Sequence, residues 1–231
     1  MRRLGNPTTV AAVLVLGTTS VFAAGLLDLP PGTVEVDHGP WNKGANSTID
    51  ITLSSVPIGA PPAGYHVWNA TYAGWCLEDN HRSDPPNGSS LPLLDSTDAN
   101  PLSCSPGDFP GVPWDNVNYL LNHPQGTLGD IPATIEDVQA ALWIVAGTDD
   151  PGNETFPITA EVSDLVTDVQ LNGPGFTPFG DDVVAVILCA DGLGPDPYQD
   201  TIIQVVLSET YWIFADGFES GNTASWSAAI P

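Results

Sequence analysis

The sequence predicts an α+β fold, in which a sandwich-like or barrel-like sheet region carries an inserted helical subdomain. Three observations predict it. The 231 residues include 23 glycines and 23 prolines, and this density of turn-forming residues suits many short strands. Apolar and polar residues alternate in much of the first third of the chain, as they do in half-buried strands. Segments with helical periodicity follow, and apolar strand-like segments return after them, so the helices fall between strands.

The strand-like segments differ in character along the chain. Residues 33–36, 47–56 (STIDITLSSV) and 65–77 place apolar side chains at every second position, which predicts strands early in the fold. Residues 182–190 (DVVAVILCA) and 201–207 (TIIQVVL) are almost continuously apolar, which is typical of strands inside a sheet. These segments supply the predicted sheet.

The middle of the chain predicts a surface connection and then helices. Residues 78–113 are rich in Asp, Ser, Asn and Pro, which favours a long connection over the surface. The helical segments are 114–122, 134–145 and 158–171. In the second of these, Thr134 is placed to cap the helix and Asp137 follows three residues later, while Val138, Leu142 and Val145 share one face.

The N-terminus has the features of a signal peptide. Arg2 and Arg3 precede an apolar run at 10–16, and the small residues Val21, Ala23 and Ala24 offer a cleavage site. We therefore expect residues 1–24 to be removed and the protein to be secreted or held at the cell surface. The remaining chain divides into one domain at 25–210, with its helical insertion at about 114–171, and a C-terminal tail at 211–231. That tail (DGFESG, then a Trp) resembles the terminal tails of secreted Gram-negative proteins, which implies processing or display.

The charge of the chain argues against two classes of partner. The formal net charge is −24, and loss of Arg2 and Arg3 with the signal peptide lowers it by two further units. Such a chain repels nucleic acid and anionic lipid, so we expect neither as a partner, nor membrane insertion of the mature chain. Aspartates at 149–150, 181–182, 191 and 196 could bind calcium, but solvated loops are the favoured interpretation. No zinc spacing is present, and we expect no metal or cofactor.

Three cysteines in an exported chain leave at least one outside an intrachain disulfide. Cys104 lies in the long connection, and Cys189 lies near the end of an apolar strand. A bridge between them closes a large loop, worth about 4–5 kcal/mol in the chain-entropy model. That pairing leaves Cys76.

The surroundings of Cys76 resemble a known family. GWCLED around Cys76, WDNVNYLLNH at 114–123 and IEDVQAALW at 135–143 follow the order seen in thioester domains of bacterial surface proteins, the TQXA type. The resemblance covers about 65–143. In that family a glutamine at the start of a helix acylates the cysteine thiol, so the matching pair is Cys76 and Gln139. Val138 stands where the adhesins have Thr.

The resemblance implies an adhesin-like protein and not a turnover enzyme. Its thioester is an electrophile that bonds covalently to an amine or hydroxyl group on a target protein or glycan, and it is consumed in doing so. Trp75, Tyr72, Tyr119 and Trp143 are candidates to keep water away from the bond. Among the histidines, His66, His81 and His123 are candidates for a base, with His123 closest to the family motif.

Two other functions stay open on the sequence alone. A non-covalent β-sandwich module could bind glycan or protein through Trp41, Trp68 and Trp114. A Cys-dependent hydrolase could pair Cys76 with a histidine, although no spacing supports it. The first predicts binding that survives loss of Cys76, and the second predicts steady turnover of ester substrates.

Overall fold

The computed structural model describes residues 25–41, 44, 47–57, 65–78, 85–98, 104, 111–126, 133–148, 156–190 and 198–207. The predicted signal peptide, the C-terminal tail at 211–231 and His81 lie outside the described residues. Six strands form a closed antiparallel barrel in the order β1-β2-β3-β6-β5-β4. They are β1 (Thr33–His38), β2 (Ile49–Ser54), β3 (Thr71–Cys76), β4 (Ser89–Asp95), β5 (Val183–Leu188) and β6 (Thr201–Val206).

The barrel interior is filled by alternate side chains of its strands. In β1, Val34 and Val36 are buried while Thr33 and Glu35 are exposed, which is the period-two pattern that its sequence predicts. The interior cluster contains aliphatic residues of the other five strands together with Tyr72 of β3. A mixed α+β fold with a barrel-like sheet is therefore confirmed.

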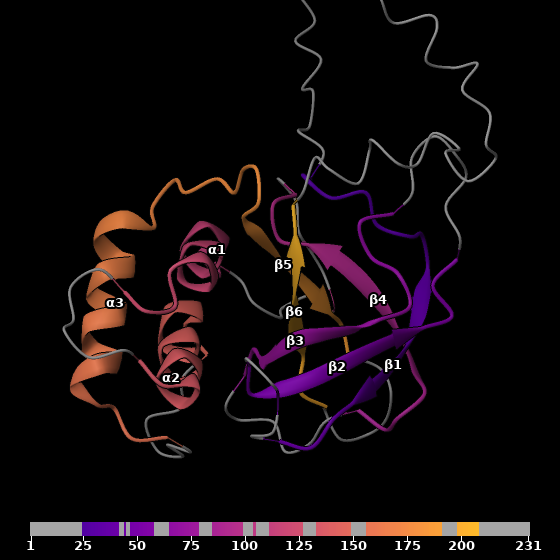
Figure 1. The fold of residues 1–231 in the computed structure, drawn as a ribbon, viewed down its shortest axis with the longest axis horizontal. Coiled ribbons are helices and arrows are strands. Elements are labelled where there is room, and N and C mark those ends of the chain that lie inside the picture. Colours follow the sequence, from indigo (N-terminus) through magenta and orange to yellow (C-terminus); the bar gives the residue numbers. More distant parts are fainter. Residues whose placement is uncertain are drawn as a thin grey trace, which may run out of the picture.

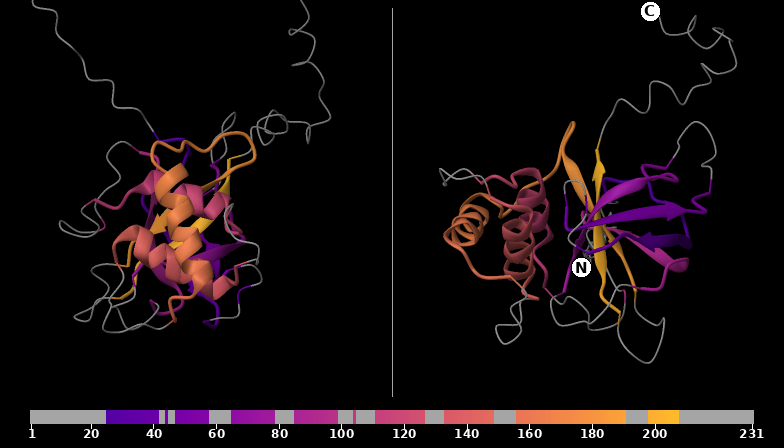
Figure 2. Two further views of the ribbon diagram at one scale, coloured as in Figure 1. Left: turned by 90° about the vertical axis from the view of Figure 1, so that its left-hand side faces the viewer. Right: turned by 60° about the horizontal axis from the view of Figure 1, so that its bottom comes forward.

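Three helices fall between β4 and β5 in the chain and cover one side of the barrel (Figure 1). They are α1 (Trp114–Asn122), α2 (Ile135–Ala146) and α3 (Ala160–Asn172). The three helices contact one another, and α1 also packs against β5. Figure 2 shows α3 outermost, with α1 and α2 between it and the sheet.

A second core lies between the helices and the outer face of the barrel. Trp75 of β3 and Ile202 of β6 are register partners, and both point from the outer face of the sheet into this second core. The residues next to them in each strand face the barrel interior. Leu120 and Leu142 meet them from the helices, and both are completely buried. The two cores share the strands β3, β5 and β6, so these strands are buried on both faces over most of their length.

The predicted surface connection at 78–113 was wrong over part of its length, because β4 lies within it. Leu91 and Leu93 of β4 point into the barrel, and the strand pairs with both β1 and β5. Pro92 explains the error, since proline removes a backbone donor and argues against a strand between two neighbours. Its carbonyl still accepts a hydrogen bond from the backbone N–H of Cys189.

Candidate functional site

Cys76 is the last residue of β3, and its backbone has no neighbouring strand on one side. It pairs with Thr201 of β6, while the next residue, Leu77, donates its N–H to Asp200. Hydrogen-bonded and non-hydrogen-bonded pairs alternate in an antiparallel ladder, so Cys76 and Thr201 form a non-hydrogen-bonded pair. The N–H and C=O of Cys76 therefore face away from β6, toward β2, whose pairing with β3 ends at Gly74.

Gln139 supplies the missing partner from the helical layer. Its carboxamide oxygen accepts a hydrogen bond from the Cys76 backbone N–H at 3.0 Å, and its carboxamide nitrogen donates to the Cys76 carbonyl at 2.7 Å. The carboxamide thus pairs with Cys76 as a strand residue would. Both residues are completely buried, as they must be for water to be excluded from a bond between them.

The first turn of α2 fixes the position of Gln139. Thr134 accepts a hydrogen bond from the Asp137 N–H, and the Asp137 carboxylate accepts one from the Thr134 N–H, which is the capping box that the sequence predicts. Thr159 also donates to Asp137 and ties the start of α3 to the start of α2. Gln139 follows in the second turn of α2, and the three hydrogen bonds just described fix the start of this helix.

Thr48 is a second donor to the Gln139 carboxamide oxygen. Its hydroxyl lies 2.7 Å from that oxygen and is completely buried just ahead of β2. Thr48 and the Cys76 N–H together give the oxygen two donors, the arrangement that stabilises an oxyanion in acyl transfer. No local signal marks Thr48, because it lies 91 residues from Gln139 in the chain.

The aromatic residues predicted to shield the bond lie in different places. Trp75, the residue before Cys76, is buried on the outer face of the sheet. Trp143 is buried one helical turn after Gln139, and its ring stacks on Phe156. Tyr72 faces the barrel interior, where its hydroxyl bonds to the backbone of Trp68.

Tyr119 and His123 contact each other instead of the Cys76 region. Their rings stack at 4.2 Å between centroids, and both meet Phe176 edge-on. His66 lies elsewhere again and accepts a hydrogen bond from the Asp28 N–H. Neither His66 nor His123 is therefore placed beside the pair.

His38 is the histidine that sequence reasoning missed. It ends β1 on the interior face of the barrel, and its Nε2 lies 3.3 Å from the hydroxyl of Thr201, the residue paired with Cys76. Burial lowers the pKa of His38 to about 4, although the nearby Asp37 carboxylate opposes the shift. The sequence does indicate that His38 is buried, because it continues the alternation of buried residues set by Val34 and Val36.

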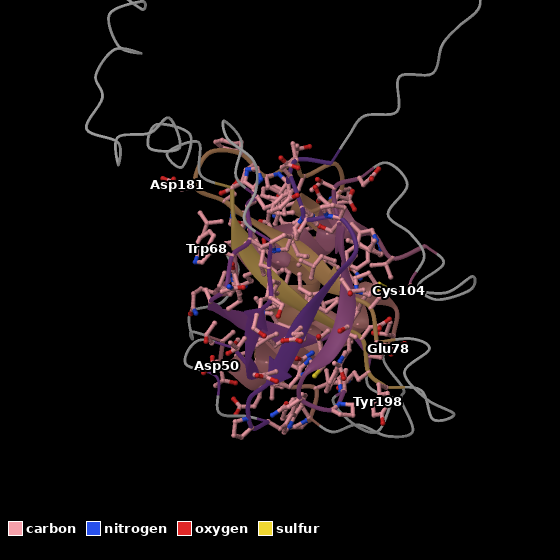
Figure 3. All side chains as sticks on the ribbon, turned by 90° about the vertical axis from the view of Figure 1, so that its right-hand side faces the viewer. Asp50, Trp68, Glu78, Cys104, Asp181 and Tyr198 are labelled. Atoms are coloured by element: carbon pink, nitrogen blue, oxygen red, sulfur yellow. A yellow bond between two sulfur atoms is a disulfide. The ribbon has the colours of Figure 1, made fainter. Side chains whose placement is uncertain are left out.

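The disulfide joins Cys104 to Cys189, as the sequence predicts, and Cys76 is buried outside it. In Figure 3, Cys104 and Glu78 lie at one edge of the barrel and Trp68 lies at the opposite edge. Trp68 is 45% exposed, whereas Trp41 stacks on Phe156. Trp114 packs against the helical core. The three tryptophans therefore form no common surface.

A cavity of about 320 Å³ opens between the helical layer and the outer face of the sheet. Its walls include Trp75 and Val138, which precede Cys76 and Gln139 in the chain, together with Thr134, Ile135 and Gln204. These five side chains carry no formal charge. The cavity is thus a mainly apolar recess, lined by the chain neighbours of Cys76 and Gln139 and not by the pair itself.

Among the described residues, no group of three or more His, Cys, Asp or Glu side chains could hold a metal ion. In the same part of the chain, no helix has the length and apolar character needed to cross a membrane. Comparisons with protein-family models, characterised proteins and solved structures give no match.

Proposed function

We propose that this protein is an exported or surface-displayed thioester domain. Cys76 and Gln139 form an internal thioester, which then bonds covalently to an amine or hydroxyl group of a target protein or glycan. The observation that carries this proposal is the paired contact of the Gln139 carboxamide with Cys76, at 3.0 and 2.7 Å, in a completely buried setting. The family resemblance of the sequence around both residues supports it independently.

Thioester formation needs no added reactant. The Cys76 sulfur bonds to the side-chain carbonyl carbon of Gln139, the C–N bond breaks, and the nitrogen leaves as ammonia with the thiol proton. Proximity supplies much of the rate, because the Gln139 carboxamide is already held against the backbone of Cys76, the residue that bears the thiol. The hydroxyl of Thr48 and the Cys76 N–H are placed to hold the negative charge that develops on the carboxamide oxygen.

The two halves of the fold have separate roles in this proposal. The barrel carries Cys76 and Thr48, and the helical layer acts as an inserted subdomain that carries Gln139. Neither half contains a complete site. Docking of the helices onto the outer face of β3 then assembles the pair, so formation of the bond follows folding.

The reaction with a target consumes the thioester. An amine nitrogen bonds to the Gln139 carbonyl carbon, the C–S bond breaks, and the proton that the amine loses ends on the Cys76 sulfur. In this proposal a slender, uncharged nucleophile enters through the recess lined by Trp75 and Val138, the residues that precede Cys76 and Gln139 in the chain. An extended aliphatic amine, such as a lysine side chain approaching as the neutral amine, fits this description.

Methylamine tests the proposed reactivity. The mature exported protein, incubated with methylamine, should gain one equivalent that tandem mass spectrometry places on Gln139, and iodoacetamide added under denaturing conditions should then label Cys76. Cys76→Ala and Gln139→Ala should gain nothing. A wild-type protein without the adduct contradicts the proposal, and adduct or ester turnover beyond one equivalent favours a hydrolase.

A further inference from the structure

The buried end of the barrel holds a polar group that the contact between Cys76 and Gln139 does not use. His38 lies 9% exposed among aliphatic side chains, and its Nδ1 is buried without a hydrogen-bond partner in the described structure. Burying a polar atom without a hydrogen-bond partner is unfavourable, because the atom loses its bonds to water. A valine at this position would continue the apolar pattern of β1 without this unfavourable burial. A histidine here therefore indicates a role beyond packing.

The geometry connects His38 to Cys76 through one residue. His38 Nε2 lies 3.3 Å from the Thr201 hydroxyl. Thr201 and Cys76 are register partners in a non-hydrogen-bonded pair, where side chains on one face come closest, with Cβ atoms about 4.5–5.5 Å apart. Both face the interior, since the adjacent pair, Trp75 and Ile202, faces the helices.

We propose that His38 and Thr201 form a proton relay for Cys76. During thioester formation the Cys76 thiol gives its proton to the Thr201 oxygen, as the Thr201 hydroxyl proton passes to His38 Nε2. The sulfur then bonds to the Gln139 carbonyl carbon. When the C–N bond breaks, His38 returns a proton to the Thr201 oxygen and the Thr201 hydroxyl proton passes to the departing nitrogen, which leaves as ammonia. This relay rests on the proposed thioester.

The surroundings of His38 suit a transient proton carrier. Its neighbours are Ile51 on β2, Asn87 ahead of β4 and Thr201 on β6, none of which is charged, and Asp37 is the charged residue that acts on it. The imidazole is neutral near pH 7 and can accept a proton. Burial makes the protonated ring a stronger acid than an exposed imidazolium, which favours return of the proton. His38 thus acts on the sulfur through Thr201.

The relay runs in the opposite direction when the thioester opens. An incoming amine loses a proton and the departing Cys76 sulfur gains one, so His38 and Thr201 should speed both reactions. General acid–base assistance is worth about 10²–10⁴-fold. Both the fraction of protein that carries the thioester and its rate of reaction with methylamine therefore report on the relay.

Matched variants of the exported full-length protein test this. His38→Gln keeps a hydrogen-bonding group but cannot carry the proton, and Thr201→Val keeps the shape but loses the hydroxyl. Each should slow the methylamine reaction at least about tenfold or leave the thioester unformed, whereas Thr201→Ser should restore the wild-type rate. His66→Gln, at a histidine away from Cys76, serves as the control. Circular dichroism and the melting temperature show that each variant is folded.

The outcomes separate the relay from the thioester. Wild-type rates in folded His38→Gln and Thr201→Val would overturn the relay and leave the thioester intact. Equal slowing in Thr201→Ser and Thr201→Val would show that packing and not the hydroxyl matters, and this also overturns the relay. A wild-type protein that never loses ammonia would overturn both proposals.

Discussion

The carboxamide of Gln139 completes the hydrogen bonding of Cys76, accepting from its backbone N–H at 3.0 Å and donating to its carbonyl at 2.7 Å. A side chain from a helix thus substitutes for a strand at the end of β3. This contact has a structural consequence, the pairing of buried backbone groups, and a chemical one, the proximity of a thiol-bearing residue and an acyl donor. The two can be measured separately.

The structural role predicts a large loss of stability when the carboxamide is removed. In a Cys76→Ala background, where no thioester can form, Gln139→Ala leaves a buried N–H and C=O unpaired. At about 1–3 kcal/mol for each unsatisfied group, the free energy of unfolding should fall by about 2–6 kcal/mol. Urea unfolding measures this. Gln125→Ala, on an exposed residue, should change it by less than about 0.5 kcal/mol, and an equally small effect for Gln139→Ala would refute the pairing.

The chemical role predicts that Thr48 accelerates thioester formation. Thr48→Val removes one of two donors to the carboxamide oxygen, which typically costs about 10²–10³-fold in rate. Thr48→Ser keeps the hydroxyl and should form the bond as the wild type does. The fraction of protein lacking one ammonia, followed by mass spectrometry after export, is the readout. Equal fractions in the Val and Ser variants would remove Thr48 from the mechanism.

Stability should decline as the pH falls from about 6.5 toward 4, because of His38. Burial lowers the pKa of His38 to about 4 in the folded state, whereas an unfolded histidine titrates near 6.5. The unfolded state therefore binds the proton first, and stability present above pH 6.5 is lost on acidification, by up to about 3 kcal/mol. Urea midpoints between pH 7 and 4 measure it. His38→Gln should flatten this part of the profile, and an unchanged slope in that variant would contradict the assignment.

Asp137 should add a second loss of stability at lower pH. Burial raises the pKa of Asp137, but hydrogen bonds from Thr159 and Thr134 outweigh it and hold the pKa below its ordinary value. The stabilisation is present above about pH 4, the unfolded pKa, and is lost as pH falls through the folded pKa. Comparing urea midpoints at pH 6 and 3, Asp137→Asn should show a smaller drop than the wild type. The exposed Asp164→Asn should match the wild type.

The sequence predicted the helices and most strands because their signals are local. The Thr134 and Asp137 capping box, for example, lies within four residues. Cys76 and Gln139 were found through motifs on either side of them. β4 was missed because Pro92 imitates a break in the sheet. Thr48 and His38 were missed because their roles depend on partners 91 and 163 residues away, which only the closed barrel brings together.

The intact mass of the mature wild-type protein tests the central claim most directly. The protein is measured in dilute acid without amines or reductant, with the N-terminus and the Cys104–Cys189 disulfide established separately. We predict a mass lower by one ammonia than the sequence and disulfide require, and no such deficit in Cys76→Ala or Gln139→Ala. A wild-type mass with no deficit, together with a Cys76 thiol that alkylates upon denaturation, would contradict the thioester.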